Sequence, residues 1–243
     1  MKELPISIQT FENIIEGEMI YVDKTAFIYK LVNKGKYYFL ARPRRFGKSL
    51  LLTTLKSFFE GKKELFKGLY IYDKEKDWTV YPVIHIDYSK VEYRDTKEIF
   101  TSSMVFHLQT IANEYQVTLV EQDIATAFNE LVIKLHQKYK QRIVVLVDEY
   151  DKPLVDSLTN PEAFERNRLI LSSLYGTMKG HDDYLRFVML TGVSRFSKVS
   201  VFSGMNNLDD ISMNKAYSTL VGFTQEELES YFCLLYTSDA ADE

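Results

Sequence analysis

The sequence predicts an α/β protein, a three-layer sandwich in which a mainly parallel central sheet carries helices on both faces. Short runs of consecutive apolar residues, such as residues 143–147, are typical of strands buried on both faces. These runs alternate along the chain with segments of helical periodicity. That order implies right-handed crossovers between parallel strands.

The first half of the chain contains two of the expected core strands. A helix is predicted over residues 26–33, which Gly35 ends, and a strand over residues 37–41. Another helix is expected at residues 49–60, followed by a short helical or turn segment between Gly61 and Gly68. The second strand is expected at residues 82–87. We interpret His85 as a strand histidine satisfied within the protein, and Asp87 as a turn residue or a residue facing the site.

The second half repeats the pattern. Two helices are predicted near residues 96–115 and 123–140, and then the third strand, residues 143–147. A further helix over residues 161–178 is expected to start with Asn160 as its N-cap and Pro161 at its first position. The fourth strand is predicted at residues 185–191.

A phosphate-binding loop follows the first strand. Residues 42–49 read Arg-Pro-Arg-Arg-Phe-Gly-Lys-Ser, which matches the end of the pattern G-x-x-x-x-G-K-[ST], with Arg42 in place of its first glycine. Gly47 would let backbone N–H groups approach phosphates, Lys48 would pair with them, and the Ser49 hydroxyl is a ligand for Mg²⁺. The predicted ATP-binding residues are Arg44, Arg45, Phe46, Gly47, Lys48, Ser49 and Leu50.

Two acids follow the third strand, where open α/β sheets bind their ligands. Asp148 would hold the Mg²⁺ or its water, together with Ser49. Glu149 would orient and activate the attacking water as a general base. The bland alternative is an acidic pair facing solvent. The spacing of about 100 residues from the Gly-Lys-Ser loop favours the catalytic interpretation.

Polar residues also end the fourth strand, in the segment 191–196, Thr-Gly-Val-Ser-Arg-Phe. We expect Thr191 or Ser194 to reach the γ-phosphate or the attacking water. Arg195 would compensate charge at the transferring phosphoryl group. An ordinary polar strand end with a surface arginine is an equal alternative.

The arginines of the loop allow three interpretations. They would hold a triphosphate, bind a nucleic-acid backbone, or pair with acids of the same domain. Because Arg42 occupies the position of a turn glycine, we expect it to contribute structure. Arg44 or Arg45 would then lie nearer the phosphates.

Composition excludes little. The chain has 243 residues, 46% of them hydrophobic, and a formal charge of −4, so bulk charge does not demand nucleic acid or a membrane surface. No stretch approaches the ~18–20 apolar residues of a transmembrane helix, and the N-terminus has no apolar signal core. We therefore expect a cytoplasmic protein without membrane association.

Four parts are expected along the chain: an N-terminal segment (1–36), the ATPase core (37–221), the start of a truncated lid or C-terminal region (222–232) and a tail (233–243). The tail breaks off from the preceding pattern and looks like translated sequencing-adapter DNA. On this interpretation the natural chain was cut near Phe232 and continues in nature. Cys233 then belongs to the tail and carries no information about disulfides or metals.

Several motifs together closely resemble the AAA-ATPase-like family of bacterial P-loop proteins. They are residues 21–25 (Tyr-Val-Asp-Lys-Thr), 38–49, 147–153 (Val-Asp-Glu-Tyr-Asp-Lys-Pro), 191–196, 202–212 and 220–224. The resemblance covers about residues 4–232, and Arg42 is the family's own form of the loop. It implies an ATP-binding module of a larger, DNA-directed protein, since members typically carry a C-terminal domain resembling PD-(D/E)xK nucleases, which is missing here.

The leading hypothesis is a Mg²⁺-dependent ATPase coupled to that missing domain, in which Lys48 and the two acids converge across adjacent parallel strands. The alternatives are a non-hydrolysing nucleotide switch, a degenerate scaffold, and a nucleic-acid-binding module built on Arg42, Arg44 and Arg45. A kinase is less favoured, because Glu149 after Asp148 suits water activation. DNA binding by the complete protein and homo-oligomerisation are left open.

Overall fold

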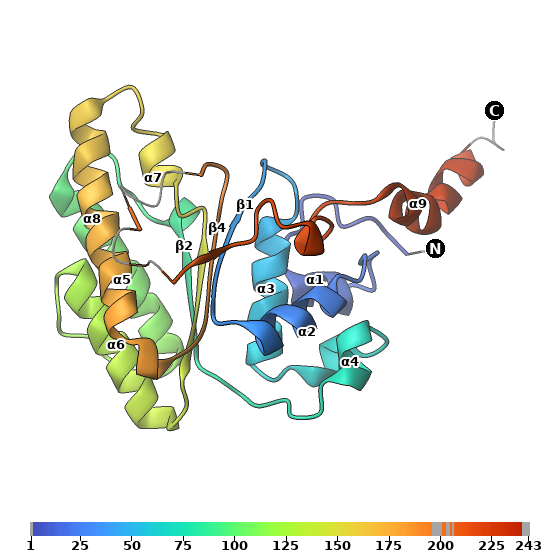
Figure 1. Cartoon of the computed structure of the whole chain (residues 1–243), viewed down its shortest axis with the longest axis horizontal. Helices are drawn as coiled ribbons and strands as arrows, with labels where there is room; N and C mark the ends of the chain where they lie inside the picture. Colours follow the sequence, from blue (N-terminus) through green and yellow to red (C-terminus); the bar gives the residue numbers. More distant parts are fainter. Residues whose placement is uncertain (1, 196–200, 203–204, 206, 240–243) are drawn as a thin grey trace.

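A parallel sheet forms the middle layer of the protein (Figure 1). The computed structural model describes residues 2–195, 201–202, 205 and 207–239, so Phe196 and parts of the predicted motif at 202–212 lie outside the described residues. Within the described residues the strand order is β2-β3-β4-β1-β5, and each pairing is parallel. The strands are β1 (Tyr37–Ala41), β2 (Val83–Asp87), β3 (Ile143–Asp148), β4 (Leu185–Gly192) and β5 (Asp209–Asp210).

Helices cover both faces of this sheet, as predicted. On one side lie α1 (Phe11–Glu16), α2 (Thr25–Lys34), α3 (Lys48–Phe59) and α4 (Tyr70–Lys74). On the other lie α5 (Lys97–Glu114), α6 (Ile124–Tyr139) and α8 (Pro161–Gly180). The short α7 (Lys152–Val155) follows β3, and α9 (Gln225–Asp239) extends away from the body (Figure 1). Short 3₁₀ turns lie at Lys63–Phe66, Tyr88–Lys90, Asp182–Tyr184 and Lys215–Tyr217.

Alternation along each strand explains the three layers. In β1, Tyr38 and Leu40 pack into the cluster under α1–α4, whereas Tyr37 and Phe39 pack into the cluster under α5, α6 and α8. Successive side chains of a strand point to opposite faces, so an unbroken apolar run supplies both cores. The predicted three-layer fold with a mainly parallel sheet, that of a P-loop NTPase, is confirmed.

The predicted helix boundaries hold to within one or two residues, and the caps explain several of them. The Asn160 side chain accepts from the amide of Ala163 at 3.1 Å, and Pro161 occupies the first turn of α8. Thr96 caps α5 in the same way, and Asp123 caps α6. Asp87 caps the turn after β2 by accepting from the amide and hydroxyl of Ser89, which confirms its turn role.

One expectation about the sheet was wrong. The strands that lead to Lys48 and to Asp148 are not adjacent, because β4 lies between β1 and β3. The carboxyl ends of all these strands still meet at one edge, where Arg42 donates its backbone N–H to the carbonyl of Gly192 at 3.1 Å. Thr191, in the inserted β4, therefore lies between the loop and the acids.

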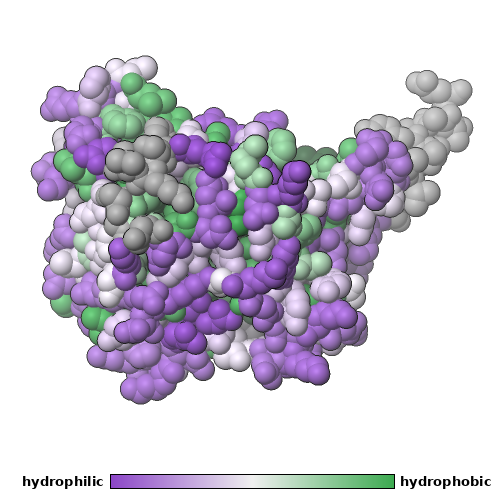
Figure 2. Space-filling model, viewed as in Figure 1, coloured by the Kyte–Doolittle hydropathy of each residue, from purple (hydrophilic) through white to green (hydrophobic). Residues whose placement is uncertain are grey.

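Across the described segments, no helix combines the length and the hydrophobicity needed to cross a bilayer. On the face shown in Figure 2, hydrophobic residues lie in small groups among hydrophilic ones. Scattered apolar side chains of this kind are normal on a protein surface.

Candidate active site

The phosphate loop joins β1 to α3 through a left-handed residue. Gly47 has φ 85° and is the N-cap of α3, so its lack of a Cβ is what permits this backbone. Lys48 is the first residue of the helix and is only 6% exposed. Its ammonium folds back and donates to the carbonyls of Arg42 and Pro43, both at 2.9 Å. The lysine is thus held inside the loop whose amides would bind phosphate.

Electrostatics link Lys48 to the acids of the next strands. Burial lowers the pKa of Lys48, while the carboxylates of Asp148, Asp151 and Glu149 oppose that shift in decreasing order. These groups therefore lie close enough to act on the ammonium, although more than 100 residues separate them in sequence. The structure brings together the lysine and the acidic pair that the sequence predicted.

Asp148 ends β3 almost completely buried, at 4% exposure. Its Oδ1 accepts from the Thr191 hydroxyl at 2.6 Å and from the Glu149 amide at 3.0 Å. The other oxygen, Oδ2, accepts no hydrogen bond from a described residue. The carboxylate is thus oriented through Oδ1.

The donors fit Mg²⁺ in its usual protein setting. Asp148 and the predicted partner Ser49 offer only oxygen ligands, and the described residues contain no cluster of three or more His, Cys, Asp or Glu side chains that would enclose a metal. Mg²⁺ is commonly bound by one or two protein oxygens, with waters and substrate phosphates completing its octahedron. Such a site needs the nucleotide to be complete.

Glu149 follows Asp148 in a backbone conformation that is rare for its type. Its φ is 52°, in the left-handed region that disfavours residues with a Cβ. Burial raises the pKa of this carboxyl, and the neighbouring Asp148 raises it further, against the opposing charges of Lys152 and Arg44. A carboxylate with a raised pKa is a stronger base, as a water-activating residue requires. The strain is typical of functional positions.

The three residues predicted at the end of β4, Thr191, Ser194 and Arg195, have different surroundings. The Thr191 hydroxyl is occupied with Asp148, as described above. Ser194 donates its amide to Asp151 and accepts from the Tyr150 hydroxyl at its carbonyl. Arg195 pairs with Asp210 at 2.6 Å, and its side chain is 53% exposed. Their predicted contacts with phosphate or water remain predictions.

Asp151 shapes the site, although the sequence alone predicted no role for it. Its carboxylate is 2% exposed and accepts from the backbone amides of Val193 and Ser194, so it fixes the loop after β4. Burial raises its pKa, against the effect of those amides. A Cβ at Gly192 would lie 2.5 Å from Asp151 Oδ1 and from the Tyr150 ring, so only glycine fits there. The signal was the repeated acid in Asp-Glu-Tyr-Asp.

The loop arginines differ in their surroundings. Arg42 donates its guanidinium to the carbonyl of Ser212, which confirms a structural role. Arg44 is exposed, yet its charge acts on both Lys48 and Glu149, so it lies near the predicted phosphate position. Arg45 is also exposed and adopts φ 66°.

One expectation for β2 was wrong. His85 Nε2 is buried without a hydrogen-bond partner, so this histidine is not satisfied within the protein. Burial lowers its pKa to about 4, against the opposing effect of Asp148. The physical reason is strand alternation, which places His85 on the same face of β2 as Val83, among apolar residues that offer Nε2 no hydrogen-bond partner.

An apolar cavity of about 630 Å³ lies beside the phosphate loop. The loop contributes Arg45, Phe46 and Gly47 to its wall, and α3 contributes Leu50, Leu51 and Thr54. Two distant segments complete it: residues 4–6 and 20–24 before β1, and residues 220–223 with Leu228 and Phe232 after β5. The predicted ATP-binding residues Phe46 and Leu50 thus face apolar space and not the acids.

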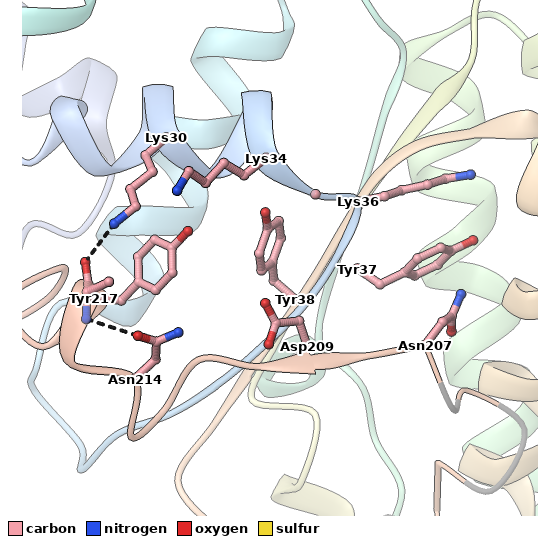
Figure 3. Close-up of a pocket in the computed structure, with 11 residues that line it drawn as sticks. Lys30, Lys34, Lys36, Tyr37, Tyr38, Asn207, Asp209, Asn214 and Tyr217 are labelled. Carbon is pink, nitrogen blue, oxygen red and sulfur yellow. Dashed lines mark hydrogen bonds between the residues drawn. The ribbon is translucent and has the colours of Figure 1, made fainter.

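A second pocket, of about 510 Å³, lies at the opposite end of β1 (Figure 3). Its lysines are engaged by the protein itself. Lys30 donates to the Ala216 carbonyl and lies over the Tyr217 ring, and Lys36 points away toward Asp182, which it contacts at 2.8 Å. Lys34 lies in the last turn of α2, where a cation complements the helix dipole. We assign no ligand to this pocket.

Comparison with known proteins identifies a family and one long relative. The profile of the AAA-ATPase-like family, described as predicted AAA-ATPases, matches residues 5–202. An uncharacterized protein from the vnfD 5′ region of Azotobacter chroococcum mcd 1 is 45% identical over 234 residues, which are 95% of this chain and 45% of that protein. The chain thus spans less than half the length of this relative.

Solved structures give more distant matches. Two structures of Drosophila ORC with Cdc6, one bound to poly(dA/dT) DNA and one to GC-rich DNA, align with TM-scores of 0.39 and 0.40. Each is 14% identical and covers 92% of this chain and 31% of the matched chain.

Proposed function

This chain belongs to the AAA-ATPase-like family, and from that premise we propose that it binds and hydrolyses ATP in a Mg²⁺-dependent reaction. One observation carries the proposal: Lys48, the first residue of α3, lies near the acids Asp148 and Glu149 at the carboxyl edge of the sheet, close enough for their charges to act on its ammonium. A lysine, a helix N-terminus and paired carboxylates in this relation suit a triphosphate with its metal.

The residues take separate roles in this proposal. The loop amides and Lys48 hold the β- and γ-phosphates, and Lys48 exchanges its contacts with the Arg42 and Pro43 carbonyls for phosphate oxygens. Ser49 and Asp148 hold Mg²⁺, which when bound neutralises charge on the phosphates. Glu149 takes a proton from the attacking water, and Arg44 adds positive charge near the γ-phosphate.

The apolar cavity accommodates the base of the nucleotide. It adjoins Gly47 and Phe46, so a triphosphate on the loop would direct its base into it. A cavity of about 630 Å³ is within the size range of small-molecule sites. We also propose, for the complete protein, a cytoplasmic location and coupling of turnover to a C-terminal nuclease-like domain that acts on DNA.

The test is phosphate release from ATP, measured together with nucleotide binding. We expect Lys48→Ala to weaken ATP binding by roughly tenfold or more, since it removes a charge-assisted contact. Glu149→Gln should keep binding but lower turnover by about 10²–10⁴-fold. Matched controls are Lys56→Ala on α3 and Glu162→Gln on α8, which lie outside the site.

The alternatives predict other results. A nucleotide switch binds ATP in a Lys48-dependent way without turnover in the wild type. A degenerate scaffold shows the same nucleotide affinity in wild type and Lys48→Ala. Turnover by Glu149→Gln at the wild-type rate would refute the role of Glu149 as the base.

A further inference from the structure

The motif Tyr-Val-Asp-Lys-Thr at residues 21–25 has no part in the chemistry proposed above, yet it is tightly built. Asp23 Oδ1 accepts from the amide and the hydroxyl of Thr25, and Asp23 Oδ2 accepts from the Tyr70 amide at 2.7 Å. The buried Thr25 hydroxyl in turn accepts from the Ile71 amide. This network ties the start of α2 to the start of α4 and fixes the backbone on both sides of Lys24.

Lys24 lines the apolar cavity, and its side chain contacts the distant C-terminal segment. Its ammonium contacts both carboxylate oxygens of Glu227, at 2.5 and 2.7 Å. The two side chains are only 11% and 23% exposed, so water screens the pair less than an ordinary surface ion pair. Burial alone would raise the pKa of Glu227, but Lys24 and the Thr224 amide lower it overall.

Glu227 also organises the beginning of α9. Its Oε2 accepts from the Thr224 amide at 2.8 Å, and the Thr224 hydroxyl accepts from the Glu227 amide at 3.2 Å. This reciprocal pair is a capping box, which fixes where the helix starts. One carboxylate thus holds both the first turn of α9 and the N-terminal segment.

The same segment has a second attachment on the phosphate loop. The Gly222 amide donates to the Phe46 carbonyl at 2.9 Å, and Gly222 has φ 77°. A Cβ at Gly222 would lie 3.3 Å from the Phe46 ring, so the chain passes close over the loop. Residues 222–227 are therefore fastened at Phe46 and at Lys24, on two sides of the apolar cavity, while α9 extends away from the body (Figure 1).

We propose that Lys24 and Glu227 are positioning residues that hold residues 222–227 closed over the nucleoside end of the bound nucleotide. This inference rests on the proposed ATP site. Because the clamp preforms one wall of the cavity, it lowers the ordering cost of binding and tightens nucleotide affinity. By linkage, bound nucleotide stabilises the clamp by the same free energy, so the start of α9 responds to nucleotide.

The experiment compares mant-ATP dissociation constants of the chain and its variants. We expect Lys24→Met and Glu227→Gln each to weaken binding by roughly tenfold, the effect of losing a charge-assisted hydrogen bond. The conservative Lys24→Arg keeps the positive charge and should retain most of the affinity. Lys34→Met and Glu226→Gln are matched controls, with exposed side chains on the same two helices, and should bind as wild type.

A second readout separates positioning from general stability. In the wild type, nucleotide should slow hydrogen exchange of the Glu227 and Leu228 amides, which bond to Thr224. In Lys24→Met this protection should be lost, although the protein remains folded. A merely structural ion pair would change the melting temperature without changing this nucleotide-dependent protection.

The outcomes are distinguishable. If the wild type does not bind mant-ATP, or binds it independently of Lys48, the proposed function fails and the inference fails with it. If binding depends on Lys48 but the Lys24 and Glu227 variants keep wild-type affinity, only the clamp is refuted. Binding by Lys24→Arg as weak as that of Lys24→Met would also refute it.

Discussion

The Thr191 hydroxyl donates to Asp148 Oδ1 at 2.6 Å, so the strand between the phosphate loop and the acidic pair orients the predicted metal ligand. Both groups are buried, at 0% and 4% exposure. A buried carboxylate needs such donors, because an unpaired one loses hydration without compensation. Thr191 was predicted to reach the γ-phosphate or the attacking water. The contact that the structure shows for its hydroxyl is with Asp148.

Thr191→Val should test this contact. Valine keeps the shape of threonine but removes the donor, so we expect a loss of about 1–3 kcal/mol in the free energy of unfolding. If Asp148 holds the metal, the Mg²⁺ concentration for half-maximal turnover should also rise. Thr110→Val, on the exposed face of α5, is the control and should change stability by less than about 0.5 kcal/mol. Equal urea midpoints for the two variants would contradict the prediction.

As the pH is lowered, we expect turnover to be lost at a higher pH than the pKa of an ordinary glutamate. The pKa of Glu149 is raised from its usual 4.5, first by burial and then by Asp148, so the carboxylate becomes protonated before a free one would. A protonated Glu149 cannot accept the proton of water, and turnover is lost as pH decreases through the raised pKa. The measurement is a pH–rate profile at saturating ATP. An acid limb at or below 4.5 would contradict this prediction.

Replacing Arg42 and Arg44 by alanine should affect different properties, stability in the first case and ATP binding in the second. Arg42→Ala removes the contact with the Ser212 carbonyl, so we expect a loss of about 1–3 kcal/mol in unfolding free energy. Arg44→Ala removes an exposed charge and should leave stability unchanged, but weaken ATP binding. Urea denaturation and nucleotide titration of both variants check this. The prediction fails if Arg44→Ala destabilises the fold and Arg42→Ala does not.

Gly192→Ala should disturb the site through its backbone. The added methyl group would overlap Asp151 and the Tyr150 ring at 2.5 Å, and the required shift should cost about 1–3 kcal/mol. Gly176→Ala is a matched control in the interior of α8, where a Cβ meets nothing within 4 Å. Because alanine favours helix, the control should be more stable by roughly 0.5–1 kcal/mol. Thermal unfolding measures both effects.

Much of the fold follows from local pattern. The apolar run at residues 143–147 predicts β3, since consecutive apolar residues suit a strand buried on both faces. Asn160 and Pro161 predict the start of α8 through its unsatisfied amides. By contrast, β5 has only two residues, Asp209 and Asp210, and forms by pairing with β1. No periodicity marks so short a strand.

The candidate site was likewise predictable only in part from the sequence. The Gly-Lys-Ser loop and the Asp-Glu pair predicted phosphate and metal chemistry. These residue types have few other functions when they directly follow strands of a parallel sheet. The strand order could not be derived, because the insertion of β4 depends on how distant segments pack. The roles of Asp151 and Gly192 depend on the same packing, which brings the two loops within hydrogen-bond distance.

By itself, therefore, the sequence determined the layers, most element boundaries and the chemical groups offered to a nucleotide, since these depend on neighbours along the chain. Only the tertiary structure decided that Thr191 orients Asp148, that His85 Nε2 is buried without a partner and that Lys24 reaches Glu227. The physical reason is distance in sequence. Contacts between residues 43 to 203 positions apart arise from the packing of whole elements, which no local pattern encodes.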